Sequence, residues 1–141
     1  MVVPFAVFLL ALAPDPVAAP GTHRVDCRGT GAAAAREFVL AQPAPDAPWR
    51  LSYRDDRHRA WIHLSLPGAE PSFDGPAARL RFRNANGGRQ IELEVRPGAP
   101  AHLDVYVDYG LDVNIDPDLD PDVDLMNTGG PLAVECTVSQ P

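Results

Sequence analysis

Lysine is absent from this chain, and all twelve of its basic residues are arginine. Cysteine is scarce, with only Cys27 and Cys136 in 141 residues. Because the two are far apart in sequence and form no Cys-x-x-Cys pair, a dithiol redox motif is excluded. The chain also has no Gly-x-Ser-x-Gly elbow and no Asn-x-Ser/Thr sequon. It therefore lacks the motif of α/β-hydrolase nucleophiles and any acceptor for N-glycosylation.

Long hydrophobic runs are missing except at the amino terminus, where residues 2–13 are apolar and uncharged. Small residues and prolines follow up to Ala19, a pattern typical of a signal peptide over residues 1–19. The alternative is an amino-terminal strand or buried helix, since the run is too short to span about 30 Å of hydrocarbon. We therefore expect a periplasmic or secreted protein with no stable membrane insertion after signal removal.

The two cysteines lie near the two ends of the chain that would remain after export. In an oxidising compartment we expect them to form a disulfide that joins the terminal strands. Such a bond would close a loop of roughly a hundred residues, for which the chain-entropy model gives about 4 to 5 kcal/mol of stabilisation.

Residues 20–141 are predicted to form a single domain, because their length fits one hydrophobic core. Alternating apolar residues separated by Gly/Pro turns predict an all-β fold, a small antiparallel β-sandwich, Ig-like or barrel-like, of about seven to eight strands. Residues 32–41 fit either one short helix or a strand. The segments with strand patterns are 23–27, 49–53, 60–66, 78–82, 91–95, 103–125, divided by Gly110, and 132–138.

Charge is distributed unevenly along the chain. Every arginine lies between Arg24 and Arg96, whereas residues 97–141 carry eight aspartates, one glutamate and no arginine. The formal net charge of −7 repels a polyanion, so nucleic acid is not expected as a partner. A negative field at one side of the molecule would instead speed its encounter with a basic protein.

The acidic stretch alternates oxygen-bearing and apolar side chains and includes a repeated Asp-Pro-Asp. Oxygen-only ligands are what calcium prefers, but Pro117 and Val123 occupy positions where an EF-hand needs glycine and glutamate. A loop-type calcium site is one interpretation, and a solvated acidic edge that prevents strand pairing is the other. The candidate metal ligands are Asp112, Asn114, Asp116, Asp118 and Asp120.

The strand parities also predict an outward-facing polar surface with two large aromatic residues. Exposed aromatics beside arginine resemble protein-binding hot spots and also suit sugars, unless a second sheet or residues 32–41 cover them. The candidate binding residues are Trp61, His63, Arg81, Asp104, Tyr106 and Asp108.

The sequence therefore favours an exported small binding protein of the inhibitor or immunity type that recognises a cationic partner protein. One alternative is a calcium-stabilised structural or adhesion module that binds glycan or a neighbouring subunit. Another is a secreted hydrolase that uses His63 or His102 with a nearby aspartate, although no spacing seats a base beside a nucleophile. We expect no enzyme activity and no cofactor other than calcium.

Overall fold

The computed structural model describes residues 15–141, so most of the predicted signal peptide lies outside the described residues. Besides strands, this part of the chain contains the 3-10 turn η1 (Gly31–Ala33), the short helix α2 (Tyr109–Asp112) and the 3-10 turn η2 (Val123–Met126). The nine strands are β1 (Arg24–Gly29), β2 (Glu37–Ala41), β3 (Trp49–Arg54), β4 (Ile62–Leu66), β5 (Ser72–Asp74), β6 (Ala77–Arg83), β7 (Arg89–Val95), β8 (Ala101–Val107) and β9 (Leu132–Ser139).

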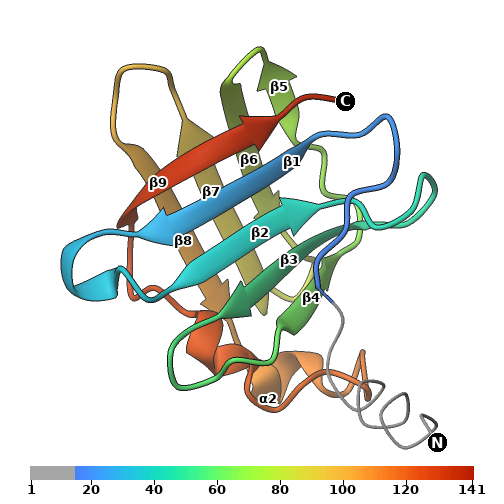
Figure 1. The fold of residues 1–141 in the computed structure, drawn as a ribbon. Coiled ribbons are helices and arrows are strands. Elements are labelled where there is room, and N and C mark those ends of the chain that lie inside the picture. Colours follow the sequence, from blue (N-terminus) through green and yellow to red (C-terminus); the bar gives the residue numbers. More distant parts are fainter. Residues whose placement is uncertain (1–14) are drawn as a thin grey trace, which may run out of the picture.

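All nine strands belong to one antiparallel sheet in the order β4-β3-β2-β1-β9-β8-β7-β6-β5. The sheet curls into a half-barrel, with β1, β2 and β3 on one side and β6, β7 and β8 on the other (Figure 1). Each strand pairs with its neighbour in sequence except across the β4–β5 connection, and β9 returns to pair with β1. The all-β prediction is confirmed with nine strands in one continuous sheet, whereas a two-sheet sandwich is not confirmed.

The predicted disulfide joins the first and last strands in the middle of the sheet. Cys27 lies directly opposite Cys136 in the β1–β9 register, and their Sγ atoms are 2.08 Å apart. Residues 32–41 divide between the two expected conformations, since η1 comes first and β2 begins at Glu37.

The core lies on the concave side of the curl and follows the predicted alternation. Ile62, Leu64 and Leu66 of β4 are fully buried, and every second residue of β6, β7 and β8 also points inward. Each such side chain contributes about 1.5 to 3 kcal/mol on transfer from water, so the alternation fixes which face of each strand points inward.

Residues 84–88 form the hairpin loop between β6 and β7 that the sequence predicted. The Asn84 side-chain oxygen accepts a hydrogen bond from the Arg89 amide at 2.9 Å, and the Gly87 amide donates to the Asn84 carbonyl at 3.0 Å. Gly87 has a φ of 74°, a conformation that a residue with a Cβ adopts at a cost. The loop holds Arg89 at the first position of β7.

The prediction of a second strand after Gly110 is wrong. Asp108 caps a helical turn instead, accepting a hydrogen bond from the Leu111 amide, and α2 begins where the alternation would have continued. The chain from α2 to η2 packs across one end of the curled sheet (Figure 1). Leu119, Val123 and Met126 are its buried apolar residues, so this segment closes that end of the core.

Within residues 15–141 no helix is both long enough and apolar enough to cross a membrane.

Candidate functional site

The structure divides the predicted binding residues between two separate outer faces of the sheet. Arg81, Asp104 and Tyr106 lie together on β6 and β8, on either side of β7, and Asp108 follows directly after β8. Trp61 and His63 lie at β4, and β3, β2, β1 and β9 separate that strand from β8. The sequence identified residues that point outward but not which strands are neighbours.

The outer face of β6, β7 and β8 is hollowed beside Tyr106. The depression has a volume of about 700 Å³, and Asn127, Gly129 and Gly130 form part of its wall. Two of its charges are paired across neighbouring strands, because the Arg81 guanidinium lies 3.3 Å from the Glu92 carboxylate. Both of these side chains are exposed. Asp104 faces Glu92 from the other side of β7, so acidic side chains outnumber basic ones toward β8.

Tyr106 is the exposed aromatic residue of this face, with 43% of its surface accessible. Its hydroxyl donates a hydrogen bond to Asp108 at 3.3 Å. Asp124 approaches the same place, because its carboxylate accepts a hydrogen bond from the Tyr109 amide at 3.5 Å. Repulsion by Asp108, with a smaller contribution from Asp124, raises the pKa of Tyr106. We call Asp104, Tyr106, Asp108 and Asp124 the Tyr106 surface.

Trp61 also points outward, but it is only 8% exposed. Of the two predicted covers, residues 32–41 contribute, because Val39 and Ala41 of β2 belong to the same buried cluster as Trp61. Ala18 packs against Trp61, the Asp15 carboxylate accepts a hydrogen bond from its indole nitrogen at 3.1 Å, and the Arg54 guanidinium lies 4.3 Å from its ring centre. The chain segment that precedes β1 therefore shields this aromatic residue.

His63 makes a close contact that the sequence did not reveal. Its Nδ1 lies 2.6 Å from the Ser52 hydroxyl on the neighbouring strand β3, because the register places the two residues opposite each other. Ser52 is only 1% exposed, so this hydroxyl lies beneath the surface. Only the pairing of β3 with β4 could have identified this contact, since eleven positions separate the residues in sequence.

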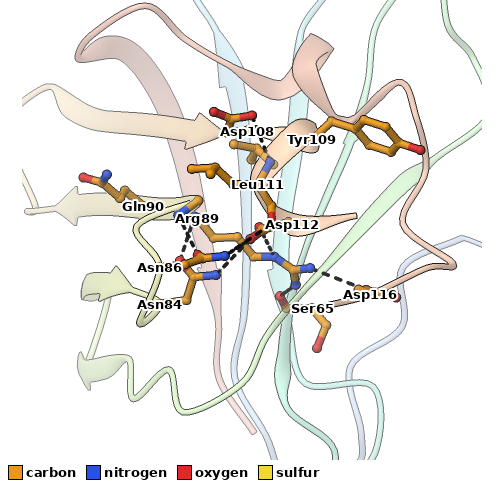
Figure 2. A network of polar contacts seen from close by, with 12 residues as sticks. Ser65, Asn84, Asn86, Arg89, Gln90, Asp108, Tyr109, Leu111, Asp112 and Asp116 are labelled. Atoms are coloured by element: carbon orange, nitrogen blue, oxygen red, sulfur yellow. Dashed lines mark hydrogen bonds and ion pairs between the residues drawn. The ribbon is translucent and has the colours of Figure 1, made fainter. Parts of the chain in front are cut away.

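The acidic segment contains one residue whose role differs from the others. Asp112 is completely buried, and its carboxylate lies 2.7 Å from the Nε of Arg89, which is itself only 5% exposed. Asn84 and Asn86 of the hairpin loop donate to the other carboxylate oxygen at 3.3 and 3.0 Å. Figure 2 shows these groups converging on Asp112.

The Arg89 guanidinium uses its remaining nitrogens to connect further segments. Nη1 donates to the Ser65 carbonyl on β4 at 2.6 Å, and Nη2 lies 3.4 Å from Asp116 (Figure 2). β4 and β7 are not neighbours in the sheet, so this arginine links the two sides of the half-barrel. Through these contacts Arg89 holds the acidic segment, at Asp112 and Asp116, against the sheet.

The predicted metal ligands are thus not arranged as one set. Asp112 and Asp116 face Arg89, whereas Asn114 and Asp118 are exposed and the Asp120 carboxylate accepts a hydrogen bond from the Asp122 amide. Among residues 15–141 no group of three or more His, Cys, Asp or Glu side chains is placed to hold a metal ion. Calcium binding stays a prediction.

Gly88 is required by the close approach of the Asp112 carboxylate. A Cβ at this position would lie 2.5 Å from Oδ1 of Asp112. We expect Gly88→Ala to lower the free energy of unfolding by about 1 to 3 kcal/mol, the usual range for overpacking a buried site. Urea denaturation followed by circular dichroism measures this loss.

The matched control is Gly110→Ala. Gly110 lies inside α2, has an ordinary φ and would meet only the Asp108 side chain, at 3.3 Å. Alanine is the better helix former by up to about 1 kcal/mol, so this variant should be as stable as the parent or slightly more stable. Equal losses in both variants would contradict the close approach of Gly88 and Asp112.

Searches against protein-family models, curated proteins and solved structures found no match for this chain.

Proposed function

We propose that this chain is an exported binding protein of the inhibitor or immunity type, which recognises a cationic partner protein through the Tyr106 surface. The observation that supports this most directly is the exposed ring of Tyr106 beside three carboxylates. Tyrosine supplies a large rigid contact area and is enriched among residues that dominate binding energy. The carboxylates supply charge complementarity, which favours rapid encounter with a basic surface.

The surroundings of the Tyr106 surface fit a protein partner. Leu111 and Leu125 are exposed at the same end of the sheet, which adds apolar area next to the acidic residues. The surface lies on paired strands and beside an end segment locked by Arg89, so its residues are held before a partner arrives. Preorganisation reduces the entropy lost on association.

The test compares two triple variants that change the net charge equally. D104N/D108N/D124N removes the three negative charges of the Tyr106 surface. The carboxamide oxygens that it introduces can still accept the hydrogen bonds that the carboxylates accepted. D46N/D56N/D74N removes three exposed aspartates in other loops and strands. Each protein is immobilised, and proteins captured from secreted and envelope fractions are quantified by mass spectrometry.

We expect a basic protein to be captured by the parent and by the D46N/D56N/D74N control, and at least tenfold less by D104N/D108N/D124N. Tyr106→Ala should also reduce its capture at least tenfold, since a hot-spot residue contributes about 2 kcal/mol or more. Equal capture by both triple variants, or a captured partner without net positive charge, would argue against this proposal.

A further inference from the structure

The outer face of β2 and β4 carries an apolar patch that is unusual for the convex side of this sheet. Val39, Ala41 and Trp61 form it, separate from the main core, and all three are buried. The corresponding outward positions of β6 and β7 hold arginine, glutamine and glutamate. An apolar patch on an outer face is typical of a surface that contacts another segment or another protein.

In the structure residues 15–19 cover the patch, and we call this segment the strap. A tight turn directs it back over the sheet: the Thr22 amide donates to the Ala19 carbonyl at 3.2 Å, and Gly21 has a φ of 78°. Pro20 and Gly21 occupy the two central positions that suit these residues in a type II turn. The predicted signal cleavage after Ala19 falls at the first peptide bond of this turn.

The strap is held by specific contacts as well as by packing. Its Ala19 amide donates to the Gln42 carbonyl at 2.8 Å, next to the end of β2. The Pro16 carbonyl accepts a hydrogen bond from Arg24, and the Asp15 carboxylate accepts one from the indole of Trp61. The hydrogen bond from Arg24 to Asp26 raises the pKa of Arg24, and the negative charge of Asp15 adds a smaller contribution in the same direction.

The surface extends beyond the strap. A hollow of about 630 Å³ continues from Trp61 across β2 and β1 to β9. Its charged lining residues are Arg24, Arg28, Arg54, Asp26, Glu37 and Glu135. Arg54 stacks on Trp61, so an aromatic ring and a guanidinium lie side by side at the centre of the face. This pair is typical of residues that anchor a bound partner.

We propose that the outer face of β2 and β4 is a docking site for an extended peptide segment of a partner protein, one with a carboxylate followed by small apolar residues. The strap is the built-in occupant of this site and displays the chemistry that the site recognises. In a chain shortened at Ala19 the site is open to a partner segment. This surface is independent of the Tyr106 surface, so either proposal can fail without the other.

The test uses a synthetic fluorescent peptide of residues 15–19 and two proteins, one that begins at Asp15 and one that begins at Pro20. Fluorescence anisotropy measures binding of the peptide to each. We expect the protein that begins at Pro20 to bind the peptide at least tenfold more tightly. In the longer protein the attached strap competes as an intramolecular ligand at high effective concentration.

Two changes test the recognised chemistry. Replacing Asp15 by Asn in the peptide should weaken binding to the shorter protein severalfold, because a charge-assisted hydrogen bond becomes a neutral one. Trp61→Phe removes the donor, so the difference between the two peptides should shrink in that variant. A scrambled peptide is the control and should not bind.

Equal binding to both proteins, or no binding to a folded protein that begins at Pro20, would overturn the proposal. If that shorter protein fails to fold, a protease site is inserted between Pro20 and Gly21 of the longer one and cut after folding. Native mass spectrometry then shows whether the cut strap stays bound. Retention that is weaker with Asp15→Asn supports the docking site, and release irrespective of residue 15 overturns it.

Discussion

Replacing Asp112 by alanine should lower the free energy of unfolding by about 3 to 5 kcal/mol, the usual result of removing one partner from a buried ion pair. The reason is that Arg89 would stay buried without the carboxylate that lies 2.7 Å from its Nε. Asn84 and Asn86 would lose their common acceptor at the same time. Urea denaturation of the oxidised protein, followed by circular dichroism, measures the change.

Two further variants distinguish this ion pair from a general effect of acidic residues. Asp118 is exposed, so Asp118→Ala should change stability by less than about 0.5 kcal/mol. The double variant R89M/D112L removes both charges and should cost less than D112A alone, because no buried charge is left unpaired. Similar effects of D112A and D118A would show that Asp112 is not locked by Arg89.

Replacing both cysteines by alanine should also lower the free energy of unfolding by a large amount. The bond between Cys27 and Cys136 spans 109 positions of the sequence, and the chain-entropy model gives about 4 to 5 kcal/mol for a loop of that size. We expect C27A/C136A to unfold at a much lower urea concentration than the oxidised parent, with a larger m-value because its unfolded chain is less compact.

Reduction provides the control for the cysteine variant. Dithiothreitol should lower the stability of the parent to nearly that of C27A/C136A and should leave C27A/C136A unchanged. If the oxidised parent and C27A/C136A unfold at the same midpoint, the disulfide does not stabilise the native state.

The sequence predicted the strands well where local alternation and burial agree. Leu103, Val105 and Val107 point inward as their parity indicated, and the hairpin at residues 84–88 follows from its Asn and Gly residues. Period-2 alternation identifies a face without information from elsewhere in the chain. The disulfide partners could also be predicted, because a chain with two cysteines allows only one intramolecular pairing.

The same alternation failed beyond Gly110, where tertiary contacts decide the structure. Leu111 and Ile115 share the parity of the core residues but are exposed, whereas Asp112 between them is fully buried. A helical turn capped by Asp108 changes the periodicity, and Arg89 from a distant hairpin compensates the buried charge. Neither the partner nor the change of period is visible in the local sequence.

The candidate site was predicted in part for a related reason. Parity placed Asp104, Tyr106 and Arg81 on outer faces correctly, but it could not show that Trp61 lies several strands away. Nor could it show that Ala18 and Asp15 contact Trp61, because they belong to a segment interpreted as a signal peptide. Strand order and the path of a terminal segment depend on contacts between residues far apart in sequence.

The position of β9 constrains when the domain can become complete. The strand formed by the last residues of the chain lies between β1 and β8, so the two meanders β1–β4 and β5–β8 have no direct pairing with each other across that junction. Without Leu132–Ser139, β1 and β8 would each present an unpaired edge at the centre of the sheet. The two meanders therefore become one continuous sheet only through β9, which pairs with β1 on one side and with β8 on the other.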